Sequence, residues 1–284
     1  MIDSWGQISV NGRLMRAGEA TVSPLDRGLL YGDGIFETIR VYEGKPFMLD
    51  AHLKRMAHGC SVISLPTPDV EEIKRWVMEA LDANDLSDAY LRIVITRGPT
   101  GGVWHELENA CPTLLILCKP YHPADFGEGL RLRLSTFRSD EQSPLTRIKH
   151  TGLLWKIMAR REARQAGVND AIMLNTKGHV AEATSANAFW VRYGVLYTPS
   201  LESGILGGIT REIVLEIARE QGMEVVEGHF AFEELLAAEE AFLTSSTWEL
   251  APIRSIEDMT FAAAPGKITK LLAKLYGECV IRDA

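Results

Sequence analysis

The sequence predicts an α+β protein of two domains. Strand-like segments come in hairpins as well as in alternation with helices, which is typical of α+β folds and not of one doubly wound sheet. The chain has 284 residues, a length that suits one large or two modest domains. The stretch 119–127 is rich in proline and aperiodic. We therefore expect a small N-terminal domain at 1–118, an interdomain linker at 119–129 and a large C-terminal domain at 130–284.

The segments before the linker have strand and helix patterns that are bounded by turn residues. The run 7–10 is followed by Asn11-Gly12, which is a strong hairpin signal. Alternating or apolar runs predict three more strands, at 36–42, 90–96 and 113–118. Apolar periodicity, interrupted by prolines, predicts helices at 49–63 and 70–83.

The segments after the linker continue this mixture. Strands are expected at 130–136, 171–174, 180–182 and 188–191. Helices are expected at about 152–166, 209–221 and 265–276. Gly167 directly follows the first of these helices, as a C-terminal cap requires.

Composition and charge exclude several classes of protein. Lys plus Arg is 30 and Asp plus Glu is 38, a net charge of −8, which disfavours nucleic-acid binding because phosphate contacts need a basic face. No segment approaches the roughly 20 apolar residues of a membrane helix, and the start lacks the features of a signal peptide. The four cysteines form no CxxC pair, which argues against zinc and for buried reduced thiols in a cytoplasmic protein.

Several common catalytic motifs are absent from the sequence. There is no GxxxxGK[ST], HExxH or GxSxG, and no GxGxxG follows a strand. The seven histidines are scattered, and His52 and His58 lie on different faces of the expected helix. Nucleotide hydrolysis, zinc proteolysis and esterase chemistry therefore have no support, and we expect no metal site.

Lys149 lies just before an expected helix, with Arg147 and His150 close by in the sequence. The positive end of the helix dipole and these neighbours favour the neutral amine. The neutral amine is the form that makes a Schiff base. A lysine before a helix is nevertheless far more often structural or solvated, so this segment alone indicates little.

Three other segments place polar groups where they could bind an anionic cofactor. Glu182 ends an expected strand and could hold a proton on a pyridine nitrogen, although a solvated glutamate in a polar turn is the commoner case. Glycines at 204, 207 and 208 precede a helix whose N–H groups could bind phosphate, or could form a tight turn capped by Thr210. The hydroxyl cluster 244–247 follows an apolar strand and could hold phosphate or carboxylate, although a plain polar loop is more common.

The order and spacing of these segments resemble the class IV aminotransferases, the fold-type IV pyridoxal phosphate family. The family signature runs from a glutamate through an asparagine and an aromatic residue, then an apolar-x-Thr step, to a Gly-apolar-x-basic end. The matching residues here are Glu182, Asn187, Phe189, Leu196, Thr198, Leu206, Gly208, Ile209 and Arg211. The resemblance extends from Tyr31 to about Ile253. It implies a D-amino acid aminotransferase-like fold of two domains and pyridoxal 5'-phosphate as the cofactor.

The resemblance also implies a role for each residue of the cofactor site. Lys149 is the expected Schiff-base lysine, and Glu182 is expected to pair with the pyridine nitrogen. Arg55 matches the family's phosphate arginine. The rest of the phosphate site is expected at Gly208, the amides of Ile209 and Thr210, and the Ser246 hydroxyl. One guanidinium, one helix N-terminus and one hydroxyl together can neutralise and orient a phosphate dianion.

The first long strand, 31–40, and the Tyr-x-Arg at 90–92 resemble the branched-chain subgroup. This implies that Tyr90 and the amides of Ser246 and Thr247 hold the substrate α-carboxylate. Arg92 and Tyr31 would hold the second carboxylate of glutamate, with Tyr31 coming from a partner subunit of a homodimer. Phe36 would line the side-chain pocket. Without the resemblance, core packing is the default for these aromatic residues.

The expected activity is amino-group exchange between an aliphatic, branched-chain L-amino acid and 2-oxoglutarate. Leu154 stands where the branched-chain subgroup often has a tyrosine, which leaves strict branched-chain specificity open. The loop 98–104 lacks the Arg-x-His of D-amino acid aminotransferases, which disfavours a D-alanine type enzyme. The runner-up is 4-amino-4-deoxychorismate lyase, which the run 143–145 favours and which Glu37 and Glu249 disfavour. A non-catalytic cofactor carrier is disfavoured because Lys149 and Glu182 occur together.

Overall fold

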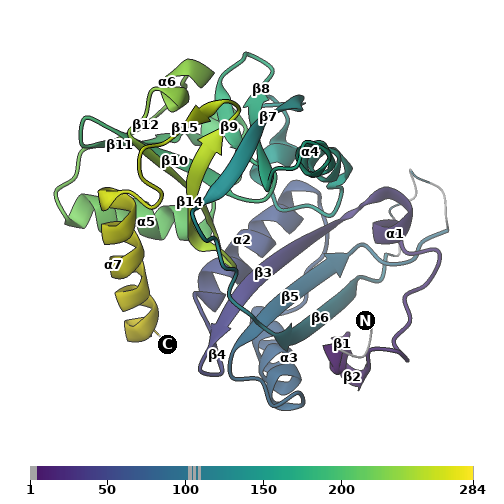
Figure 1. Cartoon of the computed structure of the whole chain (residues 1–284). Helices are drawn as coiled ribbons and strands as arrows, with labels where there is room; N and C mark the ends of the chain where they lie inside the picture. Colours follow the sequence, from purple (N-terminus) through teal and green to yellow (C-terminus); the bar gives the residue numbers. More distant parts are fainter. Residues whose placement is uncertain (1–4, 102–103, 105–106, 108–109, 284) are drawn as a thin grey trace. The chain divides into compact units, whose positions relative to one another are not determined.

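The computed structural model describes residues 5–101, 104, 107 and 110–283. They form two compact units (Figure 1). The first unit takes the described residues up to His122, together with Ile148–Gly152 and Asp283. The second unit takes Pro123–Arg147 and Leu153–Arg282. Helices and strands occur in both units, which confirms the expected α+β class.

The chain passes between the units inside the stretch that we expected to be a linker, at His122 and Pro123. Lys149 lies in a segment of the first unit, whereas the expected bounds put it in the C-terminal domain. The domain bounds 1–118, 119–129 and 130–284 themselves stay a prediction. The segment Ile148–Gly152 belongs to the first unit because its backbone forms hydrogen bonds with Gly34 and Phe36 of that unit.

The first unit contains an antiparallel sheet with the strand order β2-β1-β6-β5-β3-β4. Its strands are β1 (Gln7–Val10), β2 (Arg13–Arg16), β3 (Gly34–Tyr42), β4 (Lys45–Pro46), β5 (Ala89–Thr96) and β6 (Thr113–Pro120). The turn between β1 and β2 has positive φ at Asn11 (48°) and Gly12 (80°), as the expected two-residue hairpin requires. The helices of this part are α1 (Arg27–Tyr31), α2 (Leu49–Val62) and α3 (Val70–Asp82).

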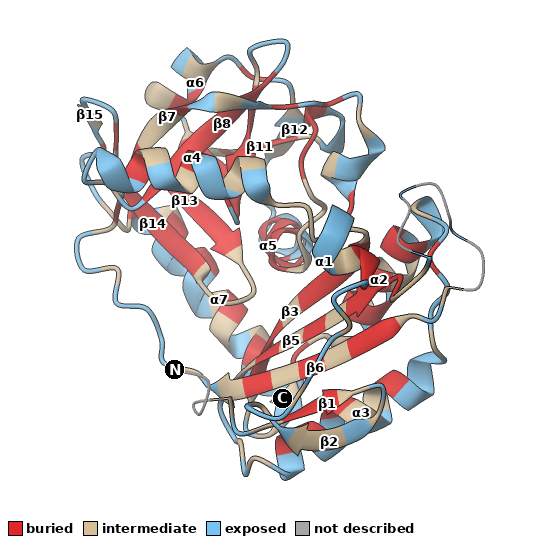
Figure 2. Cartoon of the chain, turned by 90° about the vertical axis from the view of Figure 1, so that its right-hand side faces the viewer, coloured by how far each residue is buried: buried red, intermediate tan, exposed pale blue. Residues whose placement is uncertain are grey.

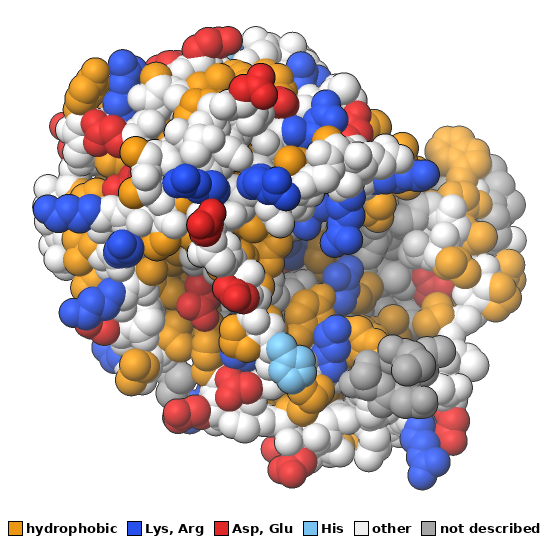
Figure 3. Space-filling model, viewed as in Figure 1, with side chains coloured by type: hydrophobic (Ala, Val, Ile, Leu, Met, Phe, Trp, Pro, Cys, Tyr) orange, Lys and Arg blue, Asp and Glu red, His pale blue; other side chains and the backbone are white. Residues whose placement is uncertain are grey.

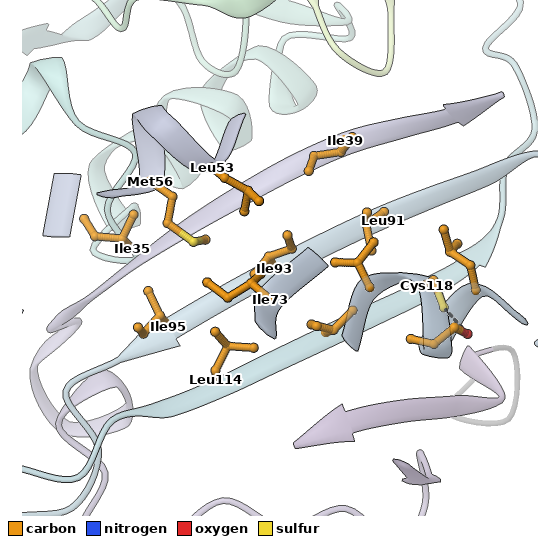
Figure 4. Packing of buried hydrophobic residues seen from close by; sticks show 14 of the residues in the cluster. Ile35, Ile39, Leu53, Met56, Ile73, Leu91, Ile93, Ile95, Leu114 and Cys118 are labelled. Carbon is orange, nitrogen blue, oxygen red and sulfur yellow. Dashed lines mark hydrogen bonds between the residues drawn. The ribbon is translucent and has the colours of Figure 1, made fainter. Parts of the chain in front are cut away.

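One face of this sheet is the core of the first unit. Apolar side chains of β3, β5 and β6 meet those of α2 and α3 (Figure 4), among them Ile93 and Leu53. Each fully buried aliphatic side chain contributes about 1.5–3 kcal/mol to folding. The opposite face carries the alternate residues of the same strands, and Figure 2 shows the resulting alternation of buried and half-buried residues. Tyr90 and Arg92 lie on this second face, half-buried.

The segment that carries Lys149 pairs with the beginning of β3. The Phe36 amide donates to the Lys149 carbonyl (2.9 Å), and the Thr151 amide donates to the Gly34 carbonyl (2.9 Å). His150 forms a β-bridge with Ile35. These bonds fix the backbone of Lys149 in an extended segment. The helix that follows begins only at Leu154, so Lys149 lies outside its first turn, where the dipole acts.

The second unit contains a sheet of mixed parallel and antiparallel pairs in the order β12-β11-β10-β13-β14-β7-β8-β9, with β15 beside β14. Its strands are β7 (Leu130–Ser139), β8 (Asp170–Asn175), β9 (Val180–Ala183), β10 (Asn187–Arg192), β11 (Val195–Pro199), β12 (Val225–Gly228), β13 (Glu240–Ser245), β14 (Glu249–Ile256) and β15 (Met259–Thr260). The helical elements from residue 144 onward are η2 (Pro144–Arg147), α4 (Leu154–Gln165), η3 (Leu201–Ser203), α5 (Ile209–Glu220), α6 (Phe232–Leu236) and α7 (Lys267–Asp283).

The end of β9 closes this sheet on itself. β9 pairs with β8 on one side and, through Glu182 opposite Asn187, with β10 on the other. The strands β10, β13, β14, β7, β8 and β9 therefore form a closed ring. Because closure occurs at Glu182 and Asn187, both side chains are held in a buried position, 3% and 4% exposed.

The cysteines only partly follow the expectation of buried thiols. Cys60 and Cys118 are buried, and burial raises the pKa of their thiols to about 12 and about 11. Cys111 is exposed and Cys279 is half-buried, so for these two the expectation was wrong. None of the helices in the described part of the chain is long and apolar enough to span a membrane.

Candidate cofactor site

Arg55 is held in place by a buried carboxylate. It lies on α2 and forms a two-pronged ion pair with Glu37 of β3, with Nε to Oε1 at 2.8 Å and Nη2 to Oε2 at 2.6 Å. His52, one turn earlier on α2, bonds Oε2 of the same carboxylate through Nδ1 at 2.7 Å. The Glu37 side chain has no exposed surface. The guanidinium expected to bind phosphate is therefore oriented by a fixed anion.

The protonation of this cluster follows from its burial and its charges. Burial alone would raise the pKa of Glu37, but the charge and hydrogen bonds of Arg55 and His52 outweigh it and hold the pKa at about 2. Burial lowers the pKa of His52, against the opposing effect of Glu37. The cluster at neutral pH is therefore an anionic Glu37, a cationic Arg55 and a neutral His52 that donates from Nδ1.

Lys149 and the expected substrate residues of the first unit form a row along the second face of the sheet. The Lys149 Nζ lies 4.9 Å from the centroid of the Phe36 ring, and the Arg92 guanidinium carbon lies 4.1 Å from the same centroid. Arg92 also donates a long hydrogen bond, 3.4 Å, to the Tyr90 hydroxyl. Figure 3 shows Lys and Arg side chains among hydrophobic ones over β3, β5 and β6.

Tyr31 differs from this row in its surroundings. It ends α1 and is 46% exposed, with the Arg27 guanidinium carbon 4.9 Å from its ring centroid. The structure therefore brings Lys149, Phe36, Arg92 and Tyr90 together. The ring of Tyr31, in contrast, meets an arginine of its own short helix.

In the second unit, Glu182 is surrounded by hydrogen-bond donors. Its Oε2 accepts from the Asn187 side-chain amide (3.1 Å) and from the Leu206 backbone amide (3.2 Å). Its Oε1 accepts from Lys156 of α4 at 2.6 Å. One cation and two N–H donors therefore surround the Glu182 carboxylate.

The N-terminus of α5 lies next to this carboxylate through Asn187. The same Asn187 amide donates to the Leu206 carbonyl (2.8 Å), just before the helix. Gly208 is the N-cap, and no side chain caps the helix. A Cβ at Gly208 would come within 2.1 Å of the Asn187 Oδ1, so only glycine permits this approach. The first amides of α5, of Ile209 and Thr210, are thus arranged as at anion-binding helix starts.

Ser246 and Thr247 form the turn between β13 and β14, and both are half-buried. The preceding Thr244 pairs with Asn187 across the two strands, so this turn lies at the same end of the closed ring as Glu182. The expected residues of the second unit are therefore gathered at one end of the sheet. Among the described residues, no group of three or more His, Cys, Asp or Glu side chains could hold a metal ion.

Several residues of this arrangement were not expected from the sequence. Lys156, the donor to Glu182, lies on α4, after Lys149 in the sequence. The sequence of α4 does not indicate which of its charged side chains points into the unit. The sequence does not indicate that Glu37 and His52 belong to this site, although Glu37 orients Arg55 and binds His52. The spacing of His52 and Arg55, one helical turn apart, was the only signal that could have linked them.

Comparison with known proteins identifies the family. The family model described as amino-transferase class IV matches residues 34–256, most of the chain. The chain is a class IV aminotransferase. A putative branched-chain-amino-acid aminotransferase of Methanocaldococcus jannaschii is 36% identical over 273 residues, which cover 95% of each protein. Aminodeoxychorismate lyase of Bacillus subtilis is 34% identical over 272 residues, covering 95% of this chain and 93% of the relative.

A solved structure of similar shape is a branched-chain aminotransferase from the thermophilic archaeon Thermoproteus uzoniensis with norvaline. It has a TM-score of 0.91 and 36% sequence identity, and the match covers 98% of this chain and 95% of that one. Another solved branched-chain amino acid aminotransferase of similar shape is complexed with N-(5'-phosphopyridoxyl)-L-glutamate. These findings confirm the resemblance, the fold class and the cofactor: this class IV aminotransferase is a transaminase dependent on pyridoxal phosphate.

The groups present in this class IV aminotransferase fit that cofactor chemically. The buried Glu182 carboxyl group suits a pyridine nitrogen, and the start of α5 behind Gly208, which no side chain caps, suits a phosphate. Within the first unit, Arg55 has a guanidinium of fixed orientation, a group of the kind that binds phosphate. Leu154, at the position of the common tyrosine, is 71% exposed on α4 and has no hydroxyl to offer a cofactor.

Proposed function

We propose that this class IV aminotransferase exchanges amino groups between branched-chain L-amino acids and 2-oxoglutarate, by a ping-pong mechanism. One observation supports the proposal most directly. The Arg92 guanidinium and the Lys149 amine lie beside the same Phe36 ring, at 4.1 and 4.9 Å from its centroid. A cation next to an apolar surface suits both a γ-carboxylate and an aliphatic side chain. The solved complex of a similar enzyme with a phosphopyridoxyl-glutamate supports glutamate as one of the substrates.

Each residue of the site has a role in this proposal. Lys149 is the covalent anchor and then the base that moves a proton at the substrate Cα. Bound pyridoxal phosphate would supply an electron sink for that proton transfer. Glu182 would keep the ring nitrogen protonated. Arg55 would bind the phosphate with Gly208, the amides of Ile209 and Thr210, and the Ser246 hydroxyl.

The substrate residues complete the proposal. Tyr90 with the turn at Ser246 and Thr247 would bind the α-carboxylate, and Arg92 would bind the second carboxylate of glutamate. Phe36 would line the side-chain pocket. We propose Tyr31 as a contribution of a partner subunit, which suits its exposed position at the end of α1.

Replacing Arg92 by leucine should weaken glutamate far more than leucine or valine. A bidentate contact between charged groups, partly desolvated, is worth about 1.5–3 kcal/mol. The catalytic efficiency with glutamate should therefore fall roughly ten- to a hundredfold, and that with leucine should change little. The measurement is the single-turnover rate with each amino acid alone. Arg75→Leu, an exposed arginine on α3, is the control. Equal losses for glutamate and leucine would show that Arg92 is structural.

The second candidate is 4-amino-4-deoxychorismate lyase, because a lyase is among the relatives at 34% identity. Release of pyruvate from aminodeoxychorismate, with no turnover of any L-amino acid, would establish it in place of the transaminase. A D-amino acid aminotransferase would be shown by turnover of D-alanine. The loop 98–104, whose sequence lacks the Arg-x-His, lies partly outside the described residues.

We also propose that the working enzyme is a cytoplasmic homodimer. Leu29 is 69% exposed, and its neighbours Leu30 and Tyr31 are also exposed, so α1 presents apolar surface. Exposed apolar patches of this kind commonly mark protein interfaces. Sedimentation should give twice the mass of the chain, and Leu29→Glu should lower both the mass and the activity. A fully active monomer would contradict the proposal.

A further inference from the structure

Lys156 of α4 forms an ion pair with Glu182 of β9 inside the second unit. Its Nζ lies 2.6 Å from Oε1, and the two side chains are 17% and 4% exposed. The other carboxylate oxygen, Oε2, accepts from Asn187 and Leu206. Lys156 therefore binds Oε1, the oxygen that does not accept from these two amides. The ion pair is largely buried, and charges interact strongly in such a position.

The other charged side chain of α4 near this pair binds different partners. Arg160, one turn further along α4, bonds Asp170 of β8 (2.7 Å), Thr184 and Ser185. β10 offers only the neutral amide of Asn187. In the second unit, Lys156 is therefore a cation in direct contact with the Glu182 carboxylate.

We propose that Lys156 is a positioning residue that lowers the proton affinity of the cofactor ring through Glu182. The inference rests on the proposed role of Glu182. A carboxylate oxygen can accept two hydrogen bonds, so Oε1 can accept from Lys156 and from a ring N–H together. The Lys156 ammonium makes the electrostatic potential at the carboxylate less negative. It also fixes the direction in which Oε1 points. The pair thus restrains how strongly Glu182 stabilises positive charge on the ring.

The test compares three variants of the holoenzyme. Lys156→Met removes the charge, Lys156→Arg keeps it, and Lys177→Met removes an exposed lysine from its ion pair with Glu141. Two readouts apply: the pH midpoint of the absorption change of the bound cofactor, and the nitrogen-15 chemical shift of a labelled cofactor ring. Removing a nearby cation raises the proton affinity of a group whose protonated form is positively charged. We expect Lys156→Met to raise the midpoint by about 0.5–1 pH unit and to move the ring nitrogen towards its protonated shift.

The controls separate this role from a structural one. Lys156→Arg and Lys177→Met should match the wild-type protein in both readouts, because neither changes the charge at Glu182. A merely structural role would lower the thermal midpoint of Lys156→Met and leave both spectroscopic readouts unchanged, which would overturn the inference. Failure of the proposed function looks different: the wild-type chain itself would show no cofactor absorption or no turnover.

Discussion

Replacing Lys149 by alanine is expected to lower the rate of amino-group transfer by roughly a thousandfold or more. The lysine supplies two functions in the proposal, the covalent bond to the cofactor and the base that moves the Cα proton. Its backbone is pinned to β3 through the Phe36 amide, so the substitution changes the side chain without releasing the segment. The measurement is the single-turnover rate with leucine at saturating cofactor, beside the circular dichroism of the folded chain.

The control and the assignment use other lysines of the same chain. Lys177→Ala, at an exposed position, should retain wild-type rates. Reduction of the holoenzyme with borohydride and peptide mapping should place the pyridoxyl group on Lys149. A label on Lys156 or on Lys177 would contradict the assignment, and so would a Lys149→Ala variant that keeps its rate.

Much of the fold could be predicted because local signals agree with it. The Asn11-Gly12 turn, the alternation along β5 and the periodicity of α2 and α3 each place an element within a few residues of its observed bounds. The end of α7 could not be predicted, since the apolar pattern weakens after Tyr276 whereas the helix continues to Asp283. Tertiary contacts, which periodicity does not report, decide such ends.

The site was harder to predict than the fold, because its contacts join elements far apart in the sequence. The sequence predicts Lys149 at a helix start, but the helix begins five residues later, and pairing with β3 fixes the residue instead. The ring closes at Glu182 and Asn187, two residues that match the family signature, and no local sequence pattern contains that pairing. Lys156 and the support of Arg55 by Glu37 likewise appear only when the strands are in register.

Replacing Glu37 by glutamine is expected to destabilise the protein by about 3–5 kcal/mol. The substitution removes the negative charge that faces the Arg55 guanidinium, which is only 13% exposed. It also leaves one acceptor oxygen where two carboxylate oxygens accept from Arg55 and His52. Arg55 should also lose its orientation, so the affinity for pyridoxal phosphate should fall. Urea unfolding measures the first effect. Glu79→Gln, in an exposed pair with Arg75 on α3, is the control and should change stability by less than about 1 kcal/mol.

The pH dependence of stability gives an independent check on the same cluster. The pKa of Glu37 is about 2 in the folded chain and 4.5 ordinarily, so its stabilisation is fully present above about pH 4.5 and is lost as the pH falls towards 2. Burial lowers the pKa of His52 from 6.5, so the unfolded chain takes up a proton that the folded chain refuses, and stability begins to fall below about pH 6.5. In Glu37→Gln the lower part of this decline should disappear. A variant with the wild-type free energy of unfolding and the same decline between pH 4.5 and 2 would show that Glu37 does not hold Arg55 as an ion pair.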